Sequence, residues 1–368
     1  MNKLAILGKG FLQIGTFGAT TLILACSGPI DSERVSMSRA VIDQLPSLGA
    51  EGIAWIDFEA LREALPEEQW KRYEEIFLEE RIFLAPDGDE LWQMWEGLGI
   101  NPREGLELIS FAIMHDAQGI GGDADHAQDE LIILISADFD HNRFESARTD
   151  AVANWSSEDV DGTTIWWVDE VNTGLAPFLA VAATPPSLGL AFLDDTTIAI
   201  GNQESLHTVI KTKGDRLEPL ELGHIMNDLI SEVTGQGQVW MVATNPLIPT
   251  QLGSDDAPLV LPGVIGNLEA ISMSVQMGDG LSARFAGITP SSEDTRMLTE
   301  SFNGLIAMGK MMLQGSQPEL FKILDGGVHA EQDDHKINIE VNLSQTNLDF
   351  LLSIAEQELR NMAIGSGL

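Results

Sequence analysis

The chain contains three short stretches that each have a counterpart further along, in the same order. The matched pairs are Ile53–Ile56 with Val239–Val242, Leu106–Ile113 with Leu268–Val275, and Ala191–Ile200 with Ala330–Ile339. Ordered internal similarity is typical of a structural unit that is built more than once along a chain. The sequence therefore predicts two similar halves, which constrains the fold more than any other feature.

Apolar and polar residues alternate within these stretches, as they do in strands that bury one face. Ile271, Met273 and Val275 fall on one face of such a strand, and Ser272 and Ser274 fall on the other. Short strands joined by turns favour antiparallel sheets with helices on one face. We therefore expect an α+β fold made of two similar halves of antiparallel sheet, with helices packed on one face.

Hydrophobic periodicity and turn residues place the expected elements. In the first half, helices are expected at Glu59–Glu80 (interrupted at Pro66), Asp89–Leu98, His141–Trp155 and Gln203–Lys211, and strands at Gly52–Phe58, Leu106–Met114, Leu131–Ala137, Thr163–Val168, Gly189–Leu193 and Thr197–Gly201. In the second half, strands are expected at Gln238–Ala243, Leu268–Met277, Leu281–Ile288, Gly327–Gln332 and Lys336–Leu343, and helices at Glu293–Leu313 and Gln345–Met362. A helix over Pro219–Thr234 is expected to connect the halves.

The start of the chain has the layout of an export signal. Lys3 and Lys9 precede an apolar run from Phe11 to Ala25, and Cys26, the chain's only cysteine, follows directly. This run is too short and too polar for a comfortable membrane-spanning helix, which needs about 20 predominantly apolar residues. An uncleaved membrane helix is the alternative interpretation.

The string Ile23-Leu24-Ala25-Cys26 resembles the lipobox of bacterial lipoproteins. The resemblance implies cleavage before Cys26, a diacylglycerol-cysteine with palmitate-type acyl chains, and stable attachment to a membrane, since a single chain anchors only marginally. It also implies a place in the cell envelope. The outer membrane is favoured if the cell is Gram-negative, because Ser27 follows the cysteine in place of an aspartate.

The expected organisation is a signal peptide over 1–25, a lipidated cysteine and flexible tether over 26–48, a first α+β repeat over 49–213, a connecting helix over 214–235 and a second repeat over 236–368. Gly99 follows a predicted helix and is expected to form its left-handed cap. With Gly99-Ile100-Asn101-Pro102 before a strand, the chain resembles exported bacterial proteins with duplicated α+β domains of unknown function. That resemblance implies a fold and no active site.

The chain is strongly acidic, with 57 Asp and Glu residues, 20 Lys and Arg residues and a formal net charge of −37. Phosphate binding depends on lysine and arginine, so this charge argues against nucleic acid and anionic lipid surfaces as partners. Two interpretations stay open. The charge is either an adaptation to a saline medium or a means of gathering cations or a basic partner.

No catalytic residue and no cofactor are predicted. The chain has no Gly-x-Ser-x-Gly nucleophile motif, its cysteine is assigned to the anchor, and its seven histidines form no zinc-binding array. Asp123, Asp125 and Asp129 are weak calcium candidates, because they offer oxygen ligands on a Gly/Asp-rich loop. Their spacing lacks the EF-hand pattern, and a solvated turn is the alternative.

The expected helix over 293–313 is rich in methionine. Its predicted ligand face consists of Met297, Phe302, Met308, Met311 and Met312. Methionine adapts to irregular partners, so this face is suited to holding an acyl chain or a hydrophobic peptide. The alternative is an ordinary core stripe, which has the same spacing.

We therefore expect a membrane-anchored extracytoplasmic protein with a binding or scaffold role and no evident catalysis. Its expected partners are the membrane, through Cys26, and an unidentified protein or hydrophobic small molecule, but not nucleic acid. Two alternatives stay open: a carrier or chaperone that holds a hydrophobic ligand on helix 293–313, and an unrecognised hydrolase.

Overall fold

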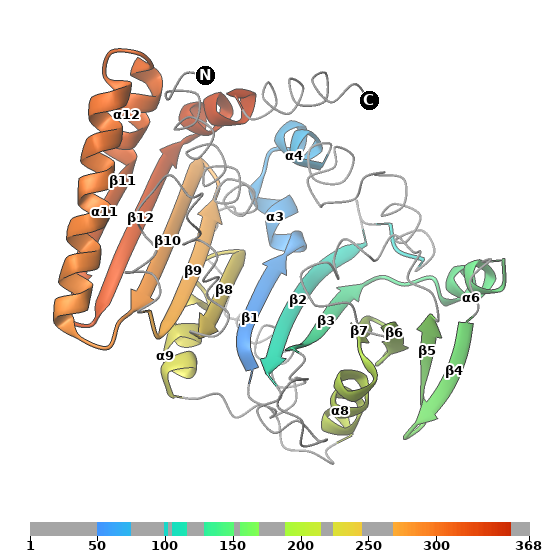
Figure 1. Cartoon of the computed structure of the whole chain (residues 1–368). Coiled ribbons are helices and arrows are strands. Elements are labelled where there is room, and N and C mark those ends of the chain that lie inside the picture. The colour runs from blue at the N-terminus through green and yellow to red at the C-terminus, as the bar shows by residue number, and fades with distance from the viewer. Residues whose placement is uncertain are drawn as a thin grey trace, which may run out of the picture. The chain divides into compact units, whose positions relative to one another are not determined.

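The computed structural model describes residues 50–74, 99–101, 105–115, 129–150, 155–168, 188–214, 224–244 and 268–354. The chain divides into two compact units between Asp228 and Leu229, here called the N-terminal unit and the C-terminal unit. The fold is mixed α+β (Figure 1), and the strands within each unit pair antiparallel. The predicted α+β class with antiparallel sheet and helices is therefore confirmed.

The N-terminal unit is rich in strands. Its elements are β1 (Ala50–Asp57), α3 (Phe58–Ala64), α4 (Glu67–Glu74), β2 (Leu106–His115), β3 (Asp129–Ala137), α6 (His141–Asp150), β4 (Trp155–Val160), β5 (Thr163–Val168), β6 (Leu188–Phe192), β7 (Thr197–Gly201) and α8 (Gln203–Lys213). Its described strands follow the order β1-β2-β3-β7-β6-β5-β4.

The C-terminal unit follows α9 (His224–Val233), which spans the boundary. Its elements are β8 (Val239–Thr244), β9 (Ala270–Met277), β10 (Gly280–Ile288), α11 (Ser292–Leu313), α12 (Pro318–Gly327), β11 (Val328–Asp333) and β12 (Lys336–Ser344). A helix over 345–354 follows β12. The described strands follow the order β8-β9-β10-β12-β11.

Five strands of each unit share one order. The run β1-β2-β3-β7-β6 in the N-terminal unit corresponds to β8-β9-β10-β12-β11 in the C-terminal unit. The matched sequence stretches fall on corresponding strands, since Leu106–Ile113 lies on β2 and Leu268–Val275 extends onto β9. Register agrees as well: Ile200 pairs with Ile133, and its counterpart Ile339 pairs with Phe285. The N-terminal unit adds the hairpin β4–β5 to this order.

Two local expectations were wrong. The helix predicted to reach Trp155 ends at Asp150, and Trp155 begins β4. Strands β4 and β5 are joined at Asp161 and Gly162, both with positive φ (53° and 84°), and an Asp-Gly pair is the preferred sequence for such a two-residue hairpin turn. Helix α12 was missed, although Pro318 stands at its first position, where proline is favoured.

Other expectations agree with the structure or lie outside it. The helix predicted after Gly52–Phe58 is interrupted at Pro66, as α3 and α4 show. Gly99 has φ +73°, the left-handed conformation expected of a cap. The predicted helix Asp89–Leu98 lies outside the described residues.

The central strands of the N-terminal unit are apolar on both faces. Ile132 and Leu134 point to one face of β3, Ile133 and Ile135 point to the other, and all four are buried. Helix α8 packs on β3, β6 and β7. It begins at Asn202, whose side-chain oxygen accepts a hydrogen bond from the Ser205 amide at 2.8 Å.

The sheet of the C-terminal unit has one apolar face, and its other face is polar over β9 to β12, while Trp240 and Val242 of β8 are buried on that second face. On the apolar face, the buried Leu268, Leu298 and Ile337 pack together, with Ile271, Phe302 and Ile339 against them. Helix α11 contacts β11 and β12, and α12 contacts β12 (Figure 1). The opposite face carries the serines of β9, as the alternation in the sequence predicts.

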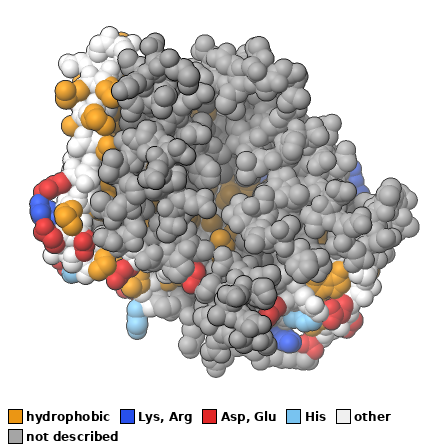
Figure 2. All heavy atoms as spheres, viewed as in Figure 1, with side chains coloured by type: hydrophobic (Ala, Val, Ile, Leu, Met, Phe, Trp, Pro, Cys, Tyr) orange, Lys and Arg blue, Asp and Glu red, His pale blue; other side chains and the backbone are white. Residues whose placement is uncertain are grey.

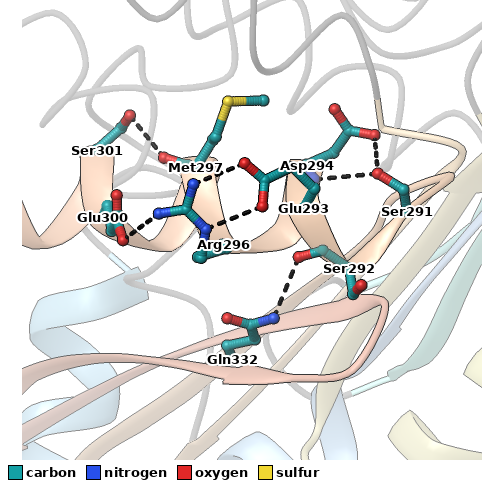
Figure 3. A network of polar contacts seen from close by, with 9 residues as sticks. All are labelled: Ser291, Ser292, Glu293, Asp294, Arg296, Met297, Glu300, Ser301 and Gln332. Carbon is teal, nitrogen blue, oxygen red and sulfur yellow. Dashed lines mark hydrogen bonds and ion pairs between the residues drawn. The ribbon is translucent and has the colours of Figure 1, made fainter.

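Polar contacts fix the start of α11 (Figure 3). The Ser291 hydroxyl caps the helix by accepting from the Asp294 amide at 3.1 Å. Arg296 donates to Glu293 and to Glu300, each at 2.6 Å. The hydrogen bond with Glu293, followed by that with Glu300, raises the pKa of the Arg296 guanidinium. The Gln332 side chain donates to the Ser292 carbonyl at 3.2 Å, which connects β11 to the first turn of α11.

Candidate binding pocket

A pocket of about 370 Å³ lies on the polar face of the C-terminal sheet. The residues that line it come from α9 and the turn after it and from all four strands β9 to β12: Glu232, Val233, Gln236, Ser272, Ser274, Arg284, Ala286, His329, Glu331, Lys336, Asn338 and Glu340. The volume is at the lower end of the range for small-molecule sites.

The strand register arranges these side chains in rows, because residues that pair across antiparallel strands share a face. One row crosses β9, β10, β12 and β11 with Ser274, Arg284, Glu340 and His329. The next row crosses the same strands with Ser272, Ala286, Asn338 and Glu331. Two adjacent rows therefore supply most of the strand residues in the lining, and Lys336 of β12, which pairs with Ile288, comes from the next row.

The face is hollowed because its central side chains are short. Ser272, Ser274 and Ala286 are buried and form the floor. Longer side chains of β10, β11 and β12 surround them. The C-terminal end of α9 adds a wall through Glu232 and Val233.

The two strong cations of the pocket already have acidic partners. Arg284 lies 2.9 Å from the Glu340 carboxylate and donates to the Gln236 side-chain oxygen at 2.7 Å. Lys336 donates to the Glu232 carboxylate. The Glu331 side chain has no ion-pair or hydrogen-bond partner among the described residues, and it is exposed. The lining thus holds two neutralised pairs and one further carboxylate.

The N-terminal unit fills the equivalent positions differently. Ile132 corresponds to Arg284, Leu134 to Ala286 and Ala199 to Asn338, as the shared strand order and register require. These three N-terminal residues are all 0% exposed. The equivalent surface is therefore apolar and buried in the N-terminal unit, but polar and open in the C-terminal unit.

The structure divides the predicted methionine face of α11. Phe302 packs on the apolar core of the sheet, whereas Met297, Met308, Met311 and Met312 are exposed, Met311 by 79%. Figure 2 shows hydrophobic side chains at the surface over α11 and α12. Phe302 therefore does not belong to one exposed ligand face with the methionines: it follows Leu298 by four residues and lies on the inner side of α11. Met311 lies farthest around the helix from Leu298, by about 140° at 100° per residue, and it is the most exposed of the four methionines.

The other predicted site residues gain no support. Cys26, Asp123 and Asp125 lie outside the described residues, and Asp129 begins β3. No group of three or more acidic, histidine or cysteine side chains within the described part of the chain is arranged to hold a metal ion. In the same part of the chain, no helix has the length and apolar character needed to cross a membrane.

The pocket was not predicted from the sequence. The polar face of β9 was visible in the alternation of Ser272 and Ser274, and a similar alternation runs through Arg284 and Ala286 on β10. The missing information was the strand order, which places β12 beside β10 and β11 beside β12.

Known proteins offer little to compare with this pocket. The chain matches no protein-family model, and no curated protein matches it. Among solved structures it is similar to one described as "Structure of crystal form IV of TP0453", with 10% sequence identity over 84% of this chain and 96% of that chain. The TM-score is 0.42, so function has to be argued from the pocket itself.

Proposed function

We propose that this protein is exported, held on a membrane through an acylated Cys26, and binds a small polar molecule in the pocket of its C-terminal unit. The lipobox-like string that ends at Cys26 supports the anchor, and Ser27 favours the outer membrane if the cell is Gram-negative. The hollowed polar face over β9 to β12 supports the binding role.

The contrast between the two units carries the binding part of this proposal. Where the N-terminal unit buries Ile132 and Leu134, the C-terminal unit presents Arg284 and the small Ala286 beside an open pocket. Replacing buried apolar side chains with charged ones sacrifices hydrophobic stabilisation, about 1.5–3 kcal/mol for each large side chain. Stability does not account for a polar hollow at positions that are apolar in the N-terminal unit, whereas the binding of a ligand does.

The N-terminal unit then has a scaffold role, in keeping with strands that are apolar on both faces. The shared strand order and the matched stretches support the further proposal that the two units are copies of one duplicated pattern. In this proposal only the second copy has a polar face available for a ligand.

Two other functions have weaker support. A carrier for a hydrophobic ligand needs an apolar cavity beneath α11. Leu298 and Phe302 fill one part of that side against the sheet. A hollow of about 260 Å³ lies between α11 and β11, but Lys310, His329 and Glu331 are among its lining residues, so it is not an apolar cavity. A hydrolase needs a nucleophile beside a base. Ser274 and His329 occupy one row three strand spacings apart, about 14 Å, which is too far for direct proton transfer.

Substitution of Cys26 tests the anchor. Cys26→Ser removes the sulfur that would carry the lipid, so the protein is expected to leave the membrane fraction or to accumulate as an uncleaved precursor. Fractionation of cells, followed by mass measurement of the intact protein, separates these outcomes. Ser27→Ala is the matched control and should leave processing unchanged. Normal processing and full membrane retention of Cys26→Ser would rule out the anchor.

A ligand panel tests the pocket. We expect at least one class among amines, sugars, amino acids and organic phosphates to shift the backbone amide signals of Ser272, Ala286 and Asn338 in NMR spectra of the full chain in detergent. Ala286→Leu places in the floor the residue that stands at the equivalent position of the N-terminal unit, and it should abolish these shifts by filling the hollow. If no class shifts these signals in the unsubstituted protein, the binding role is wrong.

A further inference from the structure

The charges of the described residues that line the pocket do not balance. Three carboxylates (Glu232, Glu331 and Glu340) face two strong cations (Arg284 and Lys336), so these five side chains carry a formal net charge of −1. Both cations are paired, Arg284 with Glu340 and Lys336 with Glu232. Glu331 is therefore the carboxylate that is available to a ligand.

Glu331 also stands at a defined place relative to the floor. It ends a row that passes from Ser272 through Ala286 and Asn338, with the buried Val242 of β8 beyond Ser272. This row offers a hydroxyl, an amide and a carboxylate on one side of the hollow, all of which accept hydrogen bonds. An ammonium group carries three donors and no acceptor, so it complements such a row.

An anion fits the same pocket poorly. To bind Arg284 or Lys336 strongly, it has to displace Glu340 or Glu232, and the displaced carboxylate then loses its partner. The formal net charge of −37 also concentrates cations around the protein and depletes anions. The electrostatics of the pocket and of the whole chain therefore favour the same sign of ligand.

The lining includes a small apolar contact surface as well. Ala286 on the floor and Val233 on the wall carry only methyl groups and both are buried. Short methylene stems can pack against such groups, while a charged head stays with its partner. A ligand with an aliphatic stem and a terminal ammonium uses both parts of the lining.

We infer that the pocket binds a small primary amine with a short aliphatic stem, whose ammonium group pairs with Glu331 and whose stem lies over Ala286 and Val233. This inference rests on the proposed binding function and adds the ligand class. The volume of about 370 Å³ suits a molecule of this size.

Three probes of equal chain length test the ligand class. Putrescine, 1,4-butanediol and succinate carry cationic, neutral and anionic ends on the same four-carbon scale. Each is titrated into the full chain in detergent at pH 7.5 and 150 mM NaCl, and binding is followed by calorimetry and by the amide signals of Ala286 and Asn338. Putrescine is expected to bind and to shift these signals, and the other two probes are expected to do neither.

Two matched substitutions locate the contact. Glu331→Gln keeps the shape of an exposed side chain and removes its charge, and it should weaken putrescine binding about tenfold, as expected for the loss of a charge-assisted hydrogen bond. Glu319→Gln makes the same change at an exposed position of α12 outside the pocket and should leave binding unchanged. Equal binding by the unsubstituted protein and Glu331→Gln, or preferred binding of succinate, would overturn the inference.

The outcomes also separate this inference from the function on which it rests. If putrescine fails but another class of the ligand panel shifts the pocket signals, the amine is wrong and the binding pocket stands. If every class fails, both are wrong.

Discussion

Gly280→Ala is expected to lower the free energy of unfolding of the C-terminal unit by about 3 kcal/mol, a value typical of forced strain at one backbone position. Gly280 opens β10 with φ +156°, a conformation that side chains with a Cβ rarely adopt. A Cβ added there would stand 2.2 Å from the Leu343 carbonyl oxygen. Because that oxygen belongs to the backbone of β12, which pairs with β10, the contact cannot be relieved by a side-chain rotation.

A second glycine of the same unit provides the control. Gly304 lies within α11, and a Cβ added there meets nothing within 4 Å. Gly304→Ala should therefore raise stability by about 0.5–1 kcal/mol, because alanine is the better helix former. Hydrogen exchange of β12 under mild urea, read by mass spectrometry, reports both changes. Effects of the same sign would contradict the assignment of Gly280 to a strained position.

Leu298→Ala should destabilise the C-terminal unit by about 3 kcal/mol, within the range for a leucine removed from a core. Leu298 is 1% exposed and packs with Leu268 and Ile337 beneath α11. The substitution removes buried methyl groups and leaves a cavity, and both effects lower stability. Urea unfolding followed by circular dichroism and hydrogen exchange of α11 measures the loss.

Met311→Ala on the outer side of α11 is the matched control. Met311 is 79% exposed, so its truncation should change the free energy of unfolding by less than about 0.5 kcal/mol. The pair distinguishes the inner face of α11 from its methionine face. A large loss at Met311 with little loss at Leu298 would show that the two faces had been exchanged.

Most strands of this protein could be predicted from the sequence, because period-two alternation is a local property. Strand β2 contains the expected strand Leu106–Met114 and one further residue, and β12 contains the expected strand Lys336–Leu343 and one further residue. The strand β4 was not predicted, because its residues from Ser156 to Asp159 are polar and show no alternation of apolar and polar side chains. Its main signal was the Asp161–Gly162 turn, whose effect depends on pairing with β5.

The methionine face shows a different limit of sequence reasoning. Helical spacing indicated one broad apolar face on α11, either a ligand face or a core stripe, but spacing alone does not say which part of it meets the sheet. The structure assigns Leu298 and Phe302 to the core and leaves Met308 and Met311 at the surface. A helix with so broad an apolar face can be oriented only once its neighbours are known.

The sequence by itself determined the secondary structure of most strands, the matched stretches and the lipobox-like start, because all of these depend on residues that are close in the chain. Only the tertiary structure decided that the serines of β9 and Glu331 of β11 line one pocket, with β10 and β12 between them. Alternation fixes the face on which a side chain lies, but strand order fixes its neighbours on that face. The pocket, and with it the proposed function, depends on strand order.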